Sequence, residues 1–258
     1  MVMRTMLDIL VLVVLNCIAV FVSVVWHTEF LTSTFLFLGI PSLYLILRER
    51  RIRLNVVGAA LIVGLLFCFV FDFIAEFNKA WGWNGGLLWG RIFGVVQIDV
   101  MVWFVLWLLQ IFLFYEHFID RTRLVLYKSE QQLKMFIAGV LSVFLLLVIY
   151  TPSPSLLYIS KAYFVLCLFV LIPFFIICVK KPKIVRRTLL IIPYFFFVYI
   201  THEITALQLH QWNFPGDYLG WIQVMGVRFP VEEFVFWIIL SSLVGATYYE
   251  FYFDNQKN

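Results

Sequence analysis

The chain has 258 residues, of which 64% are hydrophobic and only 13% are charged, with a formal net charge of +4. An ordinary soluble domain carries about 25% charged residues. The polar surface needed by a soluble enzyme, a nucleic-acid-binding domain or a disordered chain is therefore missing. The four cysteines lie in apolar stretches without CxxC spacing, which indicates buried thiols and neither a disulfide framework nor a metal site.

Long apolar segments predict an all-α, polytopic integral membrane protein. A spanning helix needs about 20 mostly apolar residues, and about eight segments meet this length. Seven spans would also be consistent, because the second and fifth segments are short. In chain order the expected helices are 6–26, 30–47, 55–77, 93–115, 133–150, 156–179, 188–207 and 229–250.

The basic residues predict the orientation of these spans, because Lys and Arg accumulate in cytoplasmic loops. With eight spans, 19 Lys and Arg residues divide unequally between the two sides. Only four fall on the outer side, namely Lys79, Arg91, Lys161 and Arg228. Both termini are therefore expected in the cytoplasm and the protein in the cell membrane. The basic runs then act as topology signals, with some contact to anionic lipid, and we expect no nucleic-acid partner.

Acidic residues are concentrated toward the outer side, several of them within spans or at span ends. A charged side chain at the centre of a spanning helix costs roughly 2.5–3.5 kcal/mol, and less near a helix end. Such positions indicate a cavity, a partner or a function. The outer acids are Glu29, Asp72, Glu76, Asp99, Glu203, Asp217, Glu232 and Glu233.

The two halves of the chain resemble each other at a spacing of about 131 residues. The matched positions are Pro41 with Pro173, Asp72 with Glu203, Trp81 with Trp212, and Asp99 with Glu232. We therefore expect two parallel four-helix repeats, 1–118 and 133–258, joined by a cytoplasmic linker at 119–132. Repeats with an even number of spans share one orientation and are related by an axis along the membrane normal. Such a bundle suits an elongated, near-symmetric ligand, and it also suits a transport path.

The repeated motif is Asp/Glu-x-x-Ala-x5-Trp, followed by an outer loop and then Pro-x-Glu-Glu-x-x-Phe. In the second half it spans Glu203 to Trp212 and then Pro230 to Phe236. With this motif the chain resembles the membrane-integral lycopene cyclase domain family, in its fused single-chain form. In the first half, Pro-x-Glu-Glu is replaced by residues 97–100, Gln-Ile-Asp-Val, which keep one acid and lose the proline.

The resemblance implies a lycopene cyclase, an intramolecular lyase or isomerase that closes the ψ-ends of lycopene into β- or ε-rings. We expect a β-cyclase, which gives γ- and β-carotene, as the default. The chemistry is a redox-neutral, acid-catalysed cyclisation through a carbocation, and it requires no cofactor and no metal. The sequence also lacks GxGxxG and GxxxxGK[ST] motifs for nucleotides. The implied partners are lycopene, membrane lipid and other membrane enzymes of carotenoid biosynthesis.

This chemistry needs a protonated carboxyl group in an apolar site, because burial raises the pKa of a carboxyl and preserves its proton. The candidate catalytic acids are Asp72, Asp99, Glu203, Glu232 and Glu233. We expect Glu232 or Glu233 to donate the proton, with Glu203 or Asp72 as the partner. Aromatic faces stabilise a carbocation, and the expected substrate-binding residues are Trp81, Trp83, Trp212, Phe234, Phe236, Trp237, Pro230 and His202.

Structural explanations compete with these roles. Pro230 fits the first turn of a helix, where Glu232 and Glu233 would complement the helix dipole, and Asp99 has the same alternative. Adjacent glutamates point about 100° apart on a helix, so at most one of the two is expected to donate.

Other candidates have similar alternatives. Asp72 and Glu76 could pair with Lys79 or Arg91, and Arg228 could pair with Glu232 or Glu233. His202 could tune or relay a proton, although a hydrogen-bonded buried histidine is the favoured interpretation.

Three other functions are compatible with the sequence. These are a cyclase or hydratase for an elongated carotenoid, a small proton-coupled carrier, and a scaffold subunit. A carrier needs a polar path toward both faces of the membrane, whereas a cyclase needs a dry aromatic cavity. The nearly pure apolar centres of the predicted helices favour the cyclase.

Overall fold

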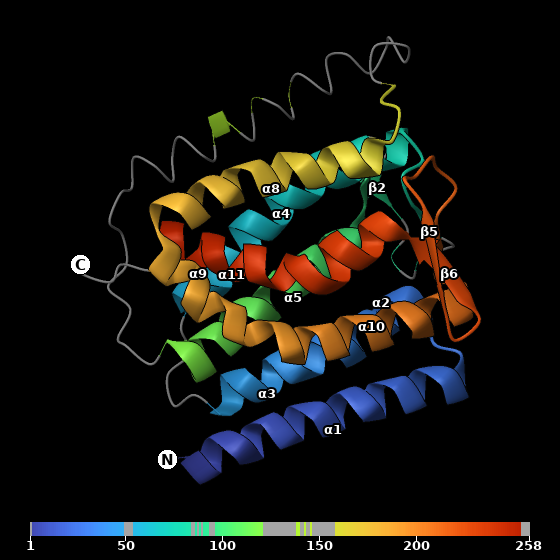
Figure 1. Ribbon diagram of the computed structural model, residues 1–258. Coiled ribbons are helices and arrows are strands. Elements are labelled where there is room, and N and C mark those ends of the chain that lie inside the picture. The colour runs from blue at the N-terminus through green and yellow to red at the C-terminus, as the bar shows by residue number, and fades with distance from the viewer. Residues whose placement is uncertain are drawn as a thin grey trace.

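In the computed structural model, the described residues are 2–48, 54–83, 86, 88, 90–92, 96–120, 138, 139, 142, 145 and 158–253. Long helices lie side by side and short strands gather at one end of the bundle (Figure 1). We call this the hairpin end. The opposite end, where α1 begins and α11 ends, carries Arg48, Lys180 and Arg187, and we call it the basic end.

The first half contains α1 (Val2–Trp26), a run of α2 (Phe30–Thr34), η1 (Phe35–Gly39) and α3 (Ile40–Arg48), then α4 (Leu54–Phe77) and α5 (Ile98–Phe114) with η2 (Tyr115–Ile119). The second half contains α8 (Ala162–Lys180), a run of α9 (Pro182–Thr188), η3 (Leu189–Ile191) and α10 (Ile192–Gln208), then η4 (Glu233–Leu240) with α11 (Ser241–Tyr252). The segments η1, η2 and η4 are π-helical, and η3 is a 3-10 helix.

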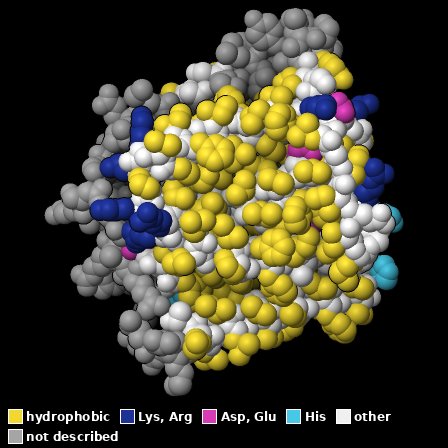
Figure 2. Space-filling model, viewed as in Figure 1, with side chains coloured by type: hydrophobic (Ala, Val, Ile, Leu, Met, Phe, Trp, Pro, Cys, Tyr) yellow, Lys and Arg dark blue, Asp and Glu magenta, His cyan; other side chains and the backbone are white. Residues whose placement is uncertain are grey.

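Seven helices of the described part are long and apolar enough to cross a membrane. This confirms that the chain is mostly helical and that these helices have the length and composition of membrane-spanning segments, as in an integral membrane protein. Figure 2 shows hydrophobic side chains over the middle of the molecule, with Lys and Arg toward its two ends. The expected span at 133–150 lies outside the described residues, apart from 138, 139, 142 and 145, which are helical.

Several predicted boundaries were wrong, all of them at the hairpin end or at a turn. The span expected from residue 93 begins at Ile98, because β2 (Arg91–Ile92) and β3 (Val96–Gln97) pair before it. The span expected from residue 156 begins at Ala162, after Lys161 in the left-handed region. Pro230 is the last residue of β6 (Val227–Pro230), so the helix begins after it. The span expected from residue 188 extends back to Pro182.

Three short antiparallel strand pairs hold the loops at the hairpin end. β1 (Gly82–Trp83) pairs with β4 (Trp212–Asn213), and β5 (Trp221–Val224) pairs with β6. The β1–β4 pair is the only one of the three that joins the two halves, and it sets Trp83 opposite Trp212.

The helices α4 and α10 end in the same way before these strands. Lys79 and His210 both have φ of 55°, a left-handed conformation that commonly terminates helices. In each case the next amide donates back to the helix, from Ala80 to the Ala75 carbonyl at 2.7 Å and from Gln211 to the Ala206 carbonyl at 2.9 Å.

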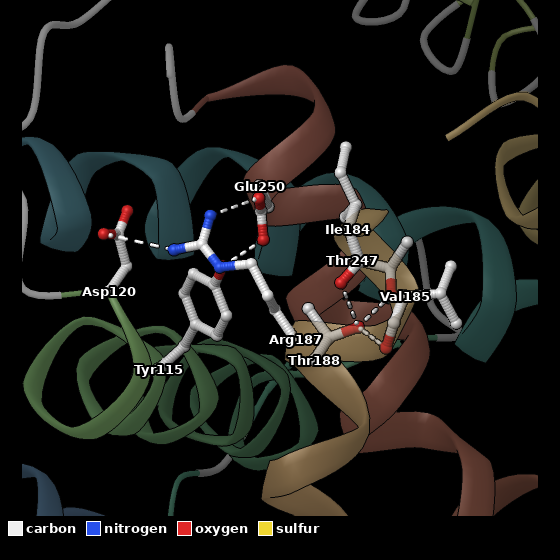
Figure 3. A network of polar contacts seen from close by, with 8 residues as sticks. All are labelled: Tyr115, Asp120, Ile184, Val185, Arg187, Thr188, Thr247 and Glu250. Atoms are coloured by element: carbon white, nitrogen blue, oxygen red, sulfur yellow. Dashed lines mark hydrogen bonds and ion pairs between the residues drawn. The ribbon is translucent and has the colours of Figure 1, made fainter. Parts of the chain in front are cut away.

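A buried polar network joins the halves at the basic end (Figure 3). The Tyr115 hydroxyl donates to Glu250, and the Tyr249 hydroxyl donates to Glu116 at 2.7 Å. Arg187 pairs with both Glu250, at 3.1 Å, and Asp120, at 3.3 Å. One guanidinium therefore compensates two buried carboxylates from opposite halves of the chain.

We expect Arg187→Gln to lower stability, because Glu250 and Asp120 would remain buried without their cation. The guanidinium is partly exposed, so the loss should be about 1–3 kcal/mol. The measurement is the apparent Tm of the detergent-solubilised protein. The matched control is Arg186→Gln, which removes an exposed arginine of the same helix. Equal Tm values for the two variants would contradict the bridging role of Arg187.

Candidate active site

A partly open cavity, with about 600 Å³ of empty space when adjoining solvent is included, lies at the hairpin end between the two halves. It is lined mainly by aromatic side chains, with Leu38, His202, Glu203 and Glu233 completing its wall. The aromatic residues are Trp81, Trp83, Trp103, Phe104, Trp107, Tyr163, Tyr199, Trp212, Phe214 and Trp237. No Lys or Arg of the described chain lines this cavity. An apolar cavity with a few convergent polar groups is the usual form of a small-molecule site.

Two glutamates meet in this cavity. Glu203 comes from α10 and Glu233 from the start of η4, and their carboxyl groups are close enough to interact with each other. Both side chains are at least nine-tenths buried. Two neighbouring carboxyl groups repel each other when both are ionised in a buried site. This arrangement is therefore suited to a carboxyl pair that shares one proton.

Neutral donors orient the pair. The Trp212 indole nitrogen donates to Glu203 Oε1 at 3.1 Å, and the Tyr163 hydroxyl donates to Glu233. Trp212 is held by the β1–β4 strand pair, and Tyr163 stands in the first turn of α8. Donors without charge fix the direction of the two carboxyls, while leaving the pair without a cationic partner in the cavity wall.

Asp72 occupies the corresponding place in the first half. It is fully buried on α4 and accepts hydrogen bonds from the indole nitrogens of Trp81, at 3.0 Å, and Trp83, at 3.4 Å. Both tryptophans line the cavity, whereas Asp72 is not part of the wall. Asp72 therefore sets the positions of two rings that face the cavity.

The neighbours Glu232 and Glu233 point to different places, as expected for adjacent residues on a helix. Glu232 Oε1 accepts from the Leu219 amide at 2.7 Å, outside the cavity. Asp99 has the same local role, because its Oδ1 accepts from the Leu88 amide at 3.1 Å. Both acids thus anchor a loop of the hairpin end to the start of the following helix.

Two of the charge pairs considered from the sequence have definite outcomes. Glu76 lies 3.5 Å from Arg91, which supports a structural role near the hairpin end. The guanidinium of Arg228 lies over the Trp221 ring, 4.5 Å from its centre. The described contact of Arg228 is therefore a cation–π interaction on the β5–β6 hairpin.

The substrate-binding residues predicted from sequence divide into three groups. Trp81, Trp83, Trp212, Trp237 and His202 line the cavity. Phe236 lines a neighbouring cavity, described below. Phe234 instead packs against Phe229 and Phe196, and Pro230 ends β6.

His202 is buried beside the carboxyl pair. Its ring stacks on Phe37 at 4.5 Å and meets the Trp212 ring edge-on at 5.3 Å. Its Nε2 atom has no hydrogen-bond partner among the described residues. The sequence favoured a hydrogen-bonded buried histidine. The structure shows a buried histidine whose Nε2 atom makes no such bond with the described residues.

Several wall residues were missed by the sequence analysis. Trp103 and Trp107 stack on Trp237 at 4.9 and 4.8 Å between ring centres. Their spacing of four residues on α5 places them on one helix face below Asp99, a signal available in the sequence. Tyr163 and Tyr199 carried no comparable signal, because their position depends on contacts with distant segments.

Outside the spans, Tyr218 links the loops around the site. Its hydroxyl donates to the Ala80 carbonyl and accepts from the Gly216 amide, both at 2.8 Å. Burial raises the pKa of this phenol well above its usual value. Among the described residues, no group of three or more His, Cys, Asp or Glu side chains is arranged to hold a metal ion.

Comparison with known proteins adds no relative to these observations. No protein-family model, no curated protein and no solved structure matches the chain.

The proton of the carboxyl pair can be observed directly. We expect the infrared spectrum of the wild-type protein at neutral pH to contain a protonated-carboxyl band. This band should be missing from the spectrum of the Glu203→Gln, Glu233→Gln double variant. Tyr163→Phe should shift the band, because it removes the hydroxyl donor to Glu233. Glu232→Gln is the matched control and should leave the band in place. A spectrum in which the double substitution removes no band would contradict a shared proton.

Proposed function

We propose that this protein is a carotenoid cyclase, a lycopene β-cyclase that acts inside the membrane. The observation that carries the proposal is the buried Glu203–Glu233 pair, which has no cation beside it in the described wall of a mainly aromatic cavity and is therefore expected to keep a proton. A proton donor in an apolar, aromatic site within a membrane bundle fits the protonation of a hydrocarbon double bond better than the chemistry of polar substrates.

The proposed reaction begins and ends at this pair. Its proton adds to the terminal double bond of a ψ-end and generates a tertiary carbocation. The next suitable double bond attacks this carbon and closes a six-membered ring, which moves the positive charge into the ring. A neighbouring ring carbon then loses a proton to the carboxylate that was left behind. One proton is taken up and one is released, so the reaction is a redox-neutral isomerisation.

Aromatic faces supply the second requirement of this reaction, which is stabilisation of the cation. The stacked rings of Trp103, Trp107 and Trp237 form one wall of the cavity. A desolvated cation over an aromatic face gains about 0.5–2 kcal/mol per ring. Few polar groups stand in this wall, so the described cavity offers less support to a carrier, which needs a polar path.

We further propose that the chain consists of two parallel repeats of four spans each, with 119–132 as the linker and both termini in the cytoplasm. The spacing of 131 relates the pairs Asp72–Trp81 and Glu203–Trp212, which make the same hydrogen bond. It also relates Gly82 to Asn213, which face each other in the β1–β4 pair. Equivalent residues that pair with each other are expected on a two-fold axis.

The first test is pigment analysis in a bacterium that accumulates lycopene. We expect the wild-type chain to form γ- or β-carotene. Glu233→Gln and Glu203→Gln should each lower conversion by about 100-fold or more, because general acid catalysis contributes 10²–10⁴-fold. Glu232→Gln should retain most activity, since an amide oxygen still accepts from Leu219. Unchanged lycopene with wild-type protein in the membrane would refute the cyclase, and an equally inactive Glu232→Gln would refute the donor assignment.

A second test addresses the aromatic wall. Trp237→Leu should lower kcat by about 2- to 30-fold, the equivalent of one lost cation–π contact, while Trp237→Phe should lose less. Trp221→Leu, which removes a tryptophan of the β5 strand outside the cavity, is the control. The readout is single-turnover cyclisation by purified protein in lipid nanodiscs. Equal kcat values for the Leu and Phe variants of Trp237 would contradict a role of the ring face.

A further inference from the structure

A second cavity adjoins the one that contains Glu203 and Glu233. It has about 520 Å³ of empty space when adjoining solvent is included, and it lies among α4, α5, α8, η4 and α11. Phe104, Trp107 and Trp237 line both cavities, so these three rings form the boundary between them. The wall continues along α11 to Tyr249 and Phe253, which places this cavity on the side of the basic end.

The hydroxyl groups in the wall of the second cavity already donate elsewhere. Ser241 donates to the Trp237 carbonyl, Tyr248 donates to the Val170 carbonyl at 2.6 Å, and Tyr249 donates to Glu116 at 2.7 Å. The other wall residues among the described part are apolar. Trp107 Nε1 is the one buried side-chain donor of this described wall without a hydrogen-bond partner. A hydrocarbon would lose no hydrogen bond on binding here, whereas a polar chain would leave most of its polar groups unpaired.

Small residues of α11 stand beside this cavity. Tyr115 and Tyr249 are 134 residues apart and make equivalent contacts with Glu250 and Glu116. At the same spacing, Trp107 and Ile111 of α5 correspond to Ser241 and Gly245 of α11. A Cβ atom at Gly245 would lie 3.3 Å from the Ile111 side chain, so the glycine allows α11 to pack closely on α5. At both positions the smaller residue belongs to the second half.

We propose that this second cavity holds the apolar chain of the substrate whose reacting end lies at Glu203 and Glu233. The inference rests on the proposed cyclase function and adds where the chain of its substrate binds. The substrate is a long, unfunctionalised polyene that passes the Trp107–Trp237 stack, with its chain directed toward the basic end. Flat conjugated chains and stacked aromatic rings are complementary in shape.

The test fills the second cavity from two opposite walls, with Val244→Phe on α11 and Val63→Phe on α4. Val235→Phe is the matched control, because Val235 is 44% exposed on η4. Purified variants are assayed with lycopene and with a truncated analogue that keeps one ψ-end and about half of the polyene. Both filling variants should lower lycopene conversion by at least about tenfold and change conversion of the analogue by less than about threefold, and Val235→Phe should alter neither.

Each outcome separates this inference from the proposed function. Filling variants that convert lycopene as well as Val235→Phe, or that lose both substrates equally, would overturn the chain-binding role. A phospholipid that copurifies with wild type and is displaced by the filling variants, with lycopene conversion unchanged, would assign the cavity to lipid. Wild-type protein that converts neither substrate would instead refute the cyclase itself. If one filling variant does not fold, the other keeps the test, because they lie on different helices.

Discussion

The burial of two neighbouring carboxyl groups, Glu203 and Glu233, in one apolar cavity is the constraint on which the proposed site depends. Without a nearby cation, two such groups are compatible with each other when they share a proton and when their hydrogen-bond donors are neutral. Trp212 and Tyr163 meet these conditions from a strand and from a helix that are distant in sequence. Glu233 itself starts a π-helix. This helix type is rare in proteins overall, and where it occurs it often lies at a functional site. The pair therefore links four segments of the chain.

The basic end contrasts with this arrangement. There, Arg187 pairs with Glu250 and Asp120, so these two carboxyl groups have a cationic partner in a partly exposed guanidinium. At the hairpin end the carboxyl pair has no cation in its described surroundings, and it is enclosed by rings. The same residue type thus joins segments at one end and forms the candidate acid pair at the other, and the difference is the presence or absence of a cation.

Much of the fold could be predicted from the sequence, because spans and caps are local features. Each apolar segment, with the acids in it, is visible in a short stretch of sequence. The pairs Asp72–Trp81 and Glu203–Trp212 are also local, because the two members of each pair are nine residues apart, and the pairs recur at a spacing of 131 residues. The start of α5 at Ile98 could not be predicted, because hydropathy does not distinguish a short apolar strand pair from a helix. Tyr163 could not be assigned either, because its contact with Glu233 crosses 70 residues.

The separate fates of Glu232 and Glu233 lie between these cases. Their divergence follows from helix geometry alone, yet the sequence does not say which of the two faces the interior. The Leu219 amide decides this, because it holds Glu232 to the loop and leaves Glu233 for the cavity. The choice of catalytic candidate thus depends on one backbone hydrogen bond.

The exchange of Tyr–Glu contacts at the basic end has a consequence for how the halves recognise each other. Tyr115 contacts Glu250, and Tyr249 contacts Glu116. Each half therefore contributes one Tyr-Glu dipeptide, and the two dipeptides contact each other. These two contacts favour side-by-side packing of half-molecules without distinguishing a first half from a second. The distinction has to come from elsewhere, and Glu233 provides it, because the first half carries Val100 beside Asp99 where the second carries Glu233 beside Glu232. The contacts that the two halves share and the glutamate that distinguishes them therefore lie at opposite ends of the same bundle.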